Sequence, residues 1–466
     1  MPCTLGRGPR LKTATANVGP EPHPQPSALY RWTVLLFVSL TMAANYYIYD
    51  SINPLQHIFV TELGFTATTF GWLNSAYAAS AILTLLVGGI VIDKIGTQRA
   101  IPCFAVICCL GAALTAASGR PSTMIAGRAL LGLGGESLVV AATTVIAKWF
   151  KGKELSFAFG IKVTIARLAS VASDNSAAWG GKVFYPHGPG GEPSWQGPLL
   201  LAVGAGLIAV LCSGVYWALE QRGAALHPQF RPVSSARRST SFRQALRFNP
   251  SYWYVVGVCL TFYSAIFPFR TFAIDFFTNR ILTVQHAAGA SEAMHVLAHQ
   301  QAGMYASLLP LSAMVATPLL GLLSDKIGKR ASLMMLAAIL LMPAYLLLGY
   351  TQVSLWVPLC MMGVAFSVIP AVMWPSVAYI VDSSRLGTAY ALMTLIEQLG
   401  FFALNLLIGS ANDQQHAGFG NLEGYRLGLL IFTTLGIAGF IFTALLRARE
   451  RSPLGHGLES ITAKSS

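Results

Sequence analysis

Three charged residues lie inside long apolar stretches of the sequence. A charge in such a stretch is energetically costly, so it usually has a function. Glu136 lies in the stretch 122–147, Arg167 in 155–180 and Glu397 in 386–411. If each stretch is a helix with about 1.5 Å of rise per residue, all three residues fall near the middle of a hydrocarbon layer about 30 Å thick. Charges at this depth mark substrate or ion pathways, so we expect the three side chains to face one cavity.

A carboxylate and a guanidinium in one cavity suit a ligand that carries both charges. Arginine pairs with a carboxylate through two parallel hydrogen bonds, and glutamate accepts hydrogen bonds from an ammonium group. Amino acids and short peptides have both groups. The alternative is that Glu136 and Arg167 pair with each other and only help the helices to pack. Four further polar or aromatic residues complete the predicted substrate site: Asn45, Tyr47, Tyr305 and Trp374.

A second group of charges lies in the C-terminal parts of the first and seventh apolar stretches. These charges are Asp50 and Arg270, and we predict that they meet as part of an outer gate, with Asp174 and Asp275 as further candidates. The alternative is that they are interfacial charges that reach the headgroups and have no gating role.

The composition indicates which solvent surrounds these residues. The chain has 466 residues, of which 54% are hydrophobic and 11% charged, and its mean hydropathy is +0.58. Soluble domains have about 25% charged residues, so soluble enzymes, nucleic-acid binders and secreted disulfide scaffolds are excluded. The sequence has no phosphate-binding loop, nucleophile elbow or zinc-protease motif. We therefore expect no enzymatic activity, no cofactor and no metal site.

Apolar stretches of membrane-spanning length occur six times on each side of a basic segment. They fall at 33–58, 69–92, 100–118, 122–147, 155–180 and 197–219, and then at 251–279, 301–324, 331–350, 354–381, 386–411 and 425–447. The sequence therefore predicts an all-α membrane protein with 12 transmembrane helices in two six-helix bundles. The predicted organisation is a disordered tail (1–30), a first bundle (31–219), a linker (220–250), a second bundle (251–447) and a C-terminal tail (448–466).

The distribution of positive charge predicts the orientation in the membrane. Of the 31 Lys and Arg residues, 23 lie in the two tails and in alternate loops. Because positively charged loops stay on the cytoplasmic side, we expect both termini to be cytoplasmic. The net charge of +13 thus reflects topology rather than nucleic-acid binding, and the basic linker is expected to attract anionic lipid headgroups.

The two halves share a motif at equivalent loops. Gly89-Ile-Val-Ile-Asp93-Lys94-Ile-Gly96 follows the second stretch, and Gly321-Leu-Leu-Ser-Asp325-Lys326-Ile-Gly328 follows the eighth, at a constant offset of 232 residues. This doubled motif resembles the G-x-x-x-D-[RK]-x-G signature of the major facilitator superfamily. Arg128-Ala-Leu-Leu-Gly132-Leu-Gly134 also resembles the R-x-x-x-G-x-G element of that family.

The resemblance implies a gating function for charged residues of these motifs. In the family the doubled loop is a cytoplasmic latch, which would assign gating roles to Asp93, Lys94, Asp325, Lys326 and Arg128. The alternative is that each loop is only a tight turn that keeps positive charge on the cytoplasmic side.

Two further patterns resemble one branch of the family, that of major facilitator superfamily domain-containing protein 1. They are the run Phe262–Arg270 followed by Asp275, and Glu136 followed 31 residues later by Arg167. Members of that branch are lysosomal dipeptide uniporters. The resemblance implies that Arg167 binds the peptide C-terminus and Glu136 its amine. The expected function is dipeptide transport by alternating access, as a uniporter or linked to protons. A carrier of organic anions or other small solutes and a non-transporting sensor or scaffold are the alternatives.

Sorting signals bear on the membrane in which the chain resides. The N-terminal tail holds no acidic dileucine motif, and the chain has no N-glycosylation sequon. These observations favour the cell (inner) membrane, with the lysosomal membrane as the alternative. The expected partners are a dipeptide substrate and the lipid bilayer, with an accessory membrane protein left open. We expect a monomer.

Overall fold

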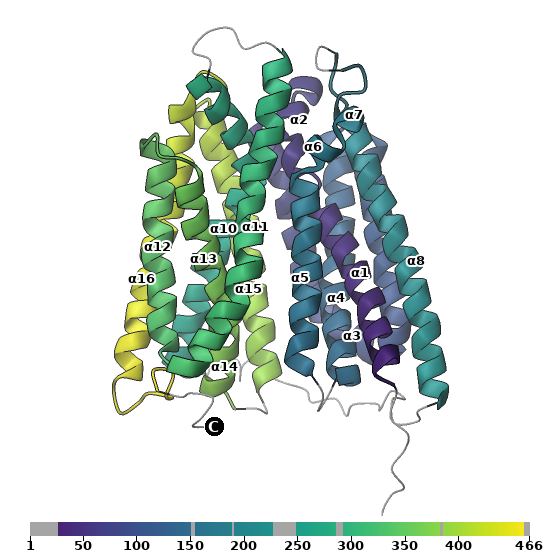
Figure 1. The fold of residues 1–466 in the computed structure, drawn as a ribbon, viewed down its shortest axis with the longest axis vertical. Coiled ribbons are helices and arrows are strands. Elements are labelled where there is room, and N and C mark those ends of the chain that lie inside the picture. Colours follow the sequence, from purple (N-terminus) through teal and green to yellow (C-terminus); the bar gives the residue numbers. More distant parts are fainter. Residues whose placement is uncertain are drawn as a thin grey trace, which may run out of the picture.

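The fold is almost entirely helical (Figure 1). The computed structural model describes residues 27–150, 154–188, 191–226, 248–285, 292–382 and 385–460. In the N-terminal half the helices are α1 (Ala28–Asp50), η1 (Asn53–Leu55), α2 (Gln56–Leu63), α3 (Ala67–Ala117), α4 (Pro121–Phe150), α5 (Leu155–Asp174), α6 (Ser176–Trp179), α7 (Gly181–Phe184) and α8 (Gln196–Leu226). In the C-terminal half they are α10 (Pro250–Gln285), α11 (Glu292–Ile327), α12 (Arg330–Tyr350), α13 (Trp356–Val368), η3 (Ile369–Met373), α14 (Trp374–Ile380), α15 (Leu386–Gln414), η4 (Leu422–Tyr425) and α16 (Arg426–Glu450).

The long helices form two bundles that stand side by side, with α1 to α8 in one and α10 to α16 in the other (Figure 1). Ten of the described helical segments are long and apolar enough to cross a membrane. The two remaining predicted spans correspond to the first part of α3 and to α5, which carries three charged residues. The predicted class, an all-α membrane protein, is confirmed, and the chain is a multi-pass membrane protein. The number of twelve spans and the cytoplasmic position of the termini stay predictions.

Both copies of the repeated motif turn the chain at the same glycine. Gly96 (φ 76°) interrupts α3, and Gly328 (φ 74°) separates α11 from α12. A positive φ favours glycine because glycine has no Cβ. The two copies of the motif therefore share the same backbone conformation at this glycine. Lys94 and Lys326 are exposed at these turns, whereas the side chain of Asp93 lies outside the described residues.

In the second copy, the motif aspartate pairs within its own bundle. Asp325 accepts a hydrogen bond from Arg330 at 3.0 Å. The Arg330 guanidinium also lies over the ring of Tyr379, 4.6 Å from its centroid. This turn therefore links the end of α11, the start of α12 and the end of α14.

The two bundles contact each other through polar groups near the end opposite the termini, which we call the outer end (top of Figure 1). There the Asp413 carboxylate of α15 accepts hydrogen bonds from the backbone N–H groups of Ala67 and Thr68, at 2.7 and 2.8 Å, and so caps the first turn of α3. Asn74 of α3 donates to Thr271 of α10 at 2.9 Å. Within the described part of the chain, no hydrogen bond or ion pair joins the bundles at the end that holds the termini.

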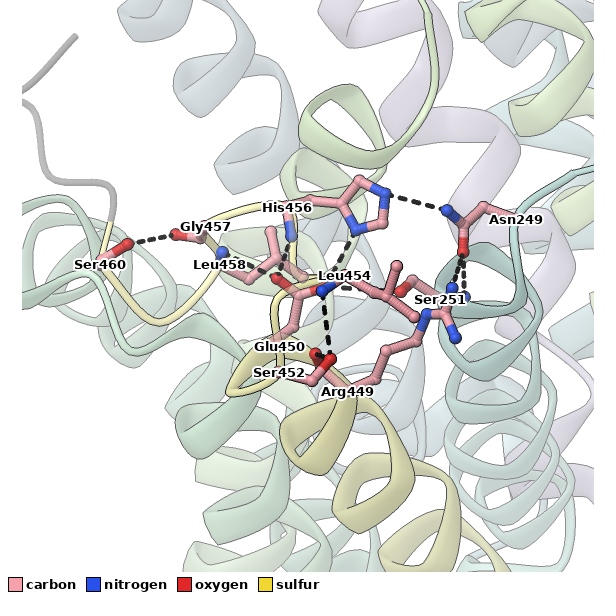
Figure 2. Close-up of polar contacts among 10 residues, drawn as sticks. All are labelled: Asn249, Ser251, Arg449, Glu450, Ser452, Leu454, His456, Gly457, Leu458 and Ser460. Carbon is pink, nitrogen blue, oxygen red and sulfur yellow. Dashed lines mark hydrogen bonds and ion pairs between the residues drawn. The ribbon is translucent and has the colours of Figure 1, made fainter.

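The chain after α16 folds back on the C-terminal bundle (Figure 2). The Glu450 carboxylate accepts hydrogen bonds from the backbone N–H groups of His456 and Leu458, at 2.8 and 3.1 Å, and Leu458 is fully buried. Glu459 caps the start of α12 through Ser332. The sequence predicts a tail from residue 448, whereas residues 451–460 contact Asn249, just before α10, and the first turn of α12. Residues 1–26 of the predicted N-terminal tail and most of the predicted linker lie outside the described residues. The first helix begins at Ala28, within the range predicted as tail.

Candidate functional site

A cavity of about 250 Å³ lies between the two bundles and contains all three charges found in the middle of the spans. It is lined by residues of both halves: Asn45, Tyr46, Tyr49, Asp50, Tyr77, Glu136, Val139, Arg167, Tyr263, Phe267, Arg270, Trp374, Thr394, Glu397, Gln398 and Phe401. Its volume is just below the range of about 300 to 1,000 Å³ that is usual for drug-sized ligands. The cavity therefore suits a small solute.

Helical periodicity places these residues on the walls of the cavity. On α15 the lining residues are Thr394, Glu397, Gln398 and Phe401, with spacings of three and four that define one helix face. On α5, Arg167 and Asp174 are two turns apart, so they share a face, with Arg167 at the cavity and Asp174 at the outer end. Each wall of the site is thus one stripe of a long helix.

The Glu136 carboxylate is held by one residue from each bundle. The Tyr77 hydroxyl of α3 donates to Oε1 at 3.1 Å, and the Gln398 side chain of α15 donates to the same oxygen at 3.3 Å. A Cβ on Gly135 would lie 2.7 Å from the Tyr77 hydroxyl oxygen. The glycine therefore leaves room for the tyrosine to reach its neighbour. Among the described residues, no hydrogen bond engages the second oxygen of Glu136.

The Arg167 guanidinium is held by an aromatic ring rather than by a carboxylate. It lies over Phe366 of α13, 4.6 Å from the ring centroid, which is a cation–π contact across the bundles. Its Nη1 atom is buried and has no hydrogen-bond partner among the described residues. Within the same set, Glu136 and Arg167 form no ion pair. Both charges are therefore free to bind a ligand.

Glu397 adds a second carboxylate to the cavity wall. It lies next to Gln398 on α15 and is 8% exposed. No hydrogen bond or ion pair to its side chain is found in the part of the chain that the structure describes. Its predicted position in the cavity agrees with the geometry, while its role in binding stays a prediction.

Three buried charges form a cluster between the cavity and the outer end. Arg270 of α10 pairs with Asp50 of α1 at 3.2 Å and with Asp174 of α5 at 3.0 Å. Arg270 and both aspartates are at most 5% exposed. One guanidinium from the C-terminal bundle thus bridges two carboxylates from the N-terminal bundle, and we call these three residues the outer triad.

Two of the other predicted gating residues, Asp275 and Arg128, lie toward the outer end but form contacts different from those of the triad. Asp275 accepts hydrogen bonds from Tyr425 at 2.5 Å and from Gln56 at 3.4 Å. Arg128 donates to the backbone carbonyls of Ile48 and Tyr49, at 3.2 and 3.0 Å, and to Asn74. Arg128 therefore caps the outer end of α1, directly beside Asp50 of the triad.

The structure places two predicted substrate residues away from the cavity. Tyr47 packs against Trp179, with ring centroids 6.3 Å apart, while its neighbour Tyr46 lines the cavity. Tyr305 packs against Phe277 and Trp356. By contrast, Asn45 and Trp374 line the cavity, as the sequence led us to expect.

Sequence reasoning missed three residues that touch the charged groups. Tyr77, Phe366 and Gln398 are uncharged, so a search for charges inside spans does not select them. The available signal was positional, because Gln398 follows Glu397 in the same span. Among the described residues, no group of three or more His, Cys, Asp or Glu side chains could hold a metal ion.

Comparison with known proteins gives consistent matches along most of the chain. A sequence model of the Major Facilitator Superfamily matches residues 35–405 and 273–463. The "Lysosomal dipeptide transporter MFSD1" of Danio rerio is 28% identical over 416 residues, which cover 88% of this chain and 86% of that protein. The Homo sapiens protein of the same name is 27% identical over 419 residues, with the same coverage of 88% and 86%.

Solved structures support the fold independently. A bacterial homologue of the human lysosomal transporter Spinster, in an inward-facing and unoccupied conformation, superimposes with a TM-score of 0.69. The match covers 91% of this chain and 98% of that one, at 16% sequence identity. At this identity the match supports the arrangement of helices and not a shared substrate.

Proposed function

The chain belongs to the major facilitator superfamily, and we propose that this transporter moves dipeptides across a membrane by alternating access. Transport occurs as uniport or linked to protons. The relatives named above are dipeptide transporters, and their name supports the lysosomal membrane as the alternative to the cell membrane.

The observation that carries this proposal is a pair of opposite charges that line one cavity without forming an ion pair with each other. Glu136 and Arg167 both line it and do not pair with each other. If they served packing alone, a mutual ion pair would compensate for the cost of burying both. A zwitterion supplies that compensation, because its ammonium group matches the carboxylate and its carboxylate matches the guanidinium. We call Glu136 and Arg167 the clamp.

The clamp has a defined orientation for a dipeptide. Arg167 binds the C-terminal carboxylate, and Phe366 beneath it keeps the guanidinium plane in place. Glu136 binds the N-terminal ammonium group while Tyr77 fixes one of its oxygens. The side chains of the substrate lie against the aromatic wall that includes Tyr263, Phe267, Trp374 and Phe401.

The outer triad closes the path on one side of the clamp. Arg270 joins the bundles through Asp50 and Asp174 at the outer end. For the site to face outward, these pairs must separate and the bundles must close at the opposite end. In this proposal the substrate favours that exchange because it contacts residues of both bundles.

Transport by purified protein in proteoliposomes tests the proposal. We expect Glu136→Gln and Arg167→Met each to lower dipeptide uptake at least tenfold, since each removes a charge-assisted contact of about 1.5 to 3 kcal/mol. Lys162→Met is the matched control. Lys162 is a buried cation on the same helix as Arg167, but it donates to Thr143 and does not line the cavity.

Two outcomes would contradict the dipeptide assignment. Full uptake by either clamp variant, with normal folding, would show that the clamp does not bind the substrate. Loss of uptake in Arg167→Met with normal uptake in Glu136→Gln would instead support a carrier of organic anions, because such a substrate has no amine to lose.

A further inference from the structure

A residue of the C-terminal bundle occupies the amine end of the clamp. Gln398 of α15 donates from Nε2 to Oε1 of Glu136 in α4, across the cavity. Tyr77 donates to that same oxygen from within the N-terminal bundle. Glu136 is therefore oriented by two donors on one oxygen, and its other oxygen is left for a ligand.

Gln398 itself has an unused acceptor. Its side chain is 2% exposed, and its carbonyl oxygen Oε1 is buried and accepts no hydrogen bond in the described part of the chain. A buried carbonyl without a donor is unfavourable because it has lost its hydrogen bonds to water and has formed no hydrogen bond within the protein. A ligand that donates to this oxygen removes the deficit and is bound more tightly for that reason.

A third acceptor of the same kind lies in the same cavity. Asn45 of α1 is 3% exposed, lines the cavity, and has a buried Oδ1 with no partner among the described residues. Together with the free oxygen of Glu136 and with Oε1 of Gln398, it makes three unpartnered oxygens. A primary ammonium group has three N–H donors and no acceptor, so the number of its donors equals the number of these acceptors in the cavity.

We propose that Gln398 is a ligand for the ammonium group of the substrate and that, with Glu136, it selects substrates with a free primary amine. This inference rests on the proposed function. It adds a contact from the C-terminal bundle to a clamp whose charged members both belong to the N-terminal bundle. The ammonium group then contacts both α4 and α15, so the bound substrate joins the two bundles of the transporter.

A purely structural role for Gln398 makes a different prediction. If the residue only joined α15 to α4, its loss would affect all substrates equally. If it binds the ammonium group, its loss reduces the preference for free amines. The decisive quantity is therefore the ratio of kcat/KM between alanyl-alanine and N-acetyl-alanyl-alanine, measured in proteoliposomes, with N-methyl-alanyl-alanine as an intermediate probe that has two N–H donors.

Gln398→Leu removes both the N–H donors and the carbonyl acceptor of the side-chain amide at similar volume. We expect the KM for alanyl-alanine to rise about tenfold and the ratio of free to acetylated substrate to fall by a similar factor, with kcat changed less. Gln398→Glu keeps an acceptor oxygen and should retain the preference for the free amine. It also provides a measurable variant if Gln398→Leu folds poorly.

Asn405→Leu is the matched control. Asn405 lies two turns further along α15, is 2% exposed and also has an unpartnered buried oxygen, but it donates to Phe401 and does not line the cavity. We expect this variant to keep the wild-type substrate ratio. An equal fall of the ratio in Asn405→Leu would overturn the proposal, because the effect would then be structural.

The outcome also separates this inference from the proposed function. If Glu136→Gln transports dipeptides normally, the clamp itself is wrong and the role of Gln398 fails with it. If Glu136→Gln is inactive while Gln398→Leu retains the wild-type ratio, the clamp stands and the inference about Gln398 alone is overturned.

Discussion

At the scale of single residues, a glycine determines how Glu136 is presented. Gly135 precedes the glutamate on α4, and a Cβ there would meet the Tyr77 hydroxyl at 2.7 Å and a ring carbon of the same tyrosine at 3.3 Å. A tyrosine ring is rigid, so it has to move as a whole to relieve this contact. Displacing it removes the hydrogen bond of 3.1 Å to the glutamate.

We therefore predict that Gly135→Ala weakens dipeptide binding by about tenfold, measured as the dissociation constant by calorimetry. Tyr77→Phe should have an effect of similar size, because it removes the same hydrogen bond without the steric change. Gly204→Ala on α8 is the control, since a Cβ at Gly204 meets no atom within 4 Å. Unchanged affinity in both Gly135→Ala and Tyr77→Phe would show that this hydrogen bond does not matter for binding.

The sequence predicts the charged part of the site better than the uncharged part. A charge in the middle of a span is energetically costly and therefore usually functional. This rule identifies Glu136, Arg167 and Glu397. The choice among tyrosines in the first span depends on the rotation of one helix. Tyr46 and Tyr47 differ by about 100° around the axis of α1, and only the packing of the neighbouring helices determines which of them faces the cavity.

At the scale of elements, the outer triad links three helices through one guanidinium. Arg270 of α10 forms ion pairs with two buried carboxylates that belong to α1 and α5. If the arginine is removed, two negative charges stay buried without a counter-ion, which is far more costly than losing an exposed ion pair. The triad thus joins α10 to α1 and α5 at the outer end, and in the proposed mechanism it stabilises the state in which that end is closed.

We predict that Arg270→Met lowers the free energy of unfolding by about 3 to 5 kcal/mol, measured by thermal and chemical denaturation in detergent. Adding Asp50→Asn and Asp174→Asn should restore most of the loss, because no unpaired charge then stays buried. Arg426→Met is the control. Its ion pair with Glu423 is exposed at the outer end and should contribute at most about 1 kcal/mol. A destabilisation of equal size in both single variants would exclude this role of the triad.

The sequence indicates the helices of the predicted outer gate but not the full pairing of their charged residues. Asp50 and Arg270 occupy equivalent positions near the ends of the first and seventh spans, which led us to expect contact between them. Asp174 and Asp275 were equally plausible additional partners. The structure distinguishes them, because Asp174 faces Arg270 whereas Asp275 lies against Tyr425. Such a distinction requires the relative rotation of α5 and α10, which sequence spacing does not contain.

At the scale of the whole molecule, the C-terminal segment joins three helices at the end that holds the termini. Glu450 accepts hydrogen bonds from the backbone of residues 456 and 458, and His456 contacts Asn249 just before α10 (Figure 2). Glu459 caps α12. Leu458 is fully buried beneath this network. The segment therefore stabilises the base of the C-terminal bundle far along the chain from the clamp.

We predict that Leu458→Ala lowers the free energy of unfolding by about 2 to 5 kcal/mol, as expected for a buried leucine. Dipeptide affinity should be unchanged, because the segment does not line the cavity. Leu454→Ala is the control, since Leu454 is 64% exposed in the same segment. Equal thermal midpoints for the wild type and Leu458→Ala would show that the segment does not contribute to stability.

The overall fold follows from the sequence more completely than this segment does. Long apolar stretches and the offset of 232 residues between Gly96 and Gly328 predict two related bundles, and both glycines take the same left-handed conformation. Residues 451–460 contain few apolar side chains, so the sequence suggests a tail. Their order depends on hydrogen bonds to Glu450 and on one buried leucine, which local composition does not reveal.

The central claim is that the clamp binds a zwitterionic dipeptide, and thermal unfolding of the purified protein with a panel of ligands tests it most directly. A ligand that binds only the folded state raises apparent stability once its concentration exceeds its dissociation constant. We predict that free dipeptides raise the unfolding temperature of the wild type, that amine-blocked dipeptides do not, and that Glu136→Gln removes the effect. Equal stabilisation by amine-blocked dipeptides or by inorganic anions would contradict the claim.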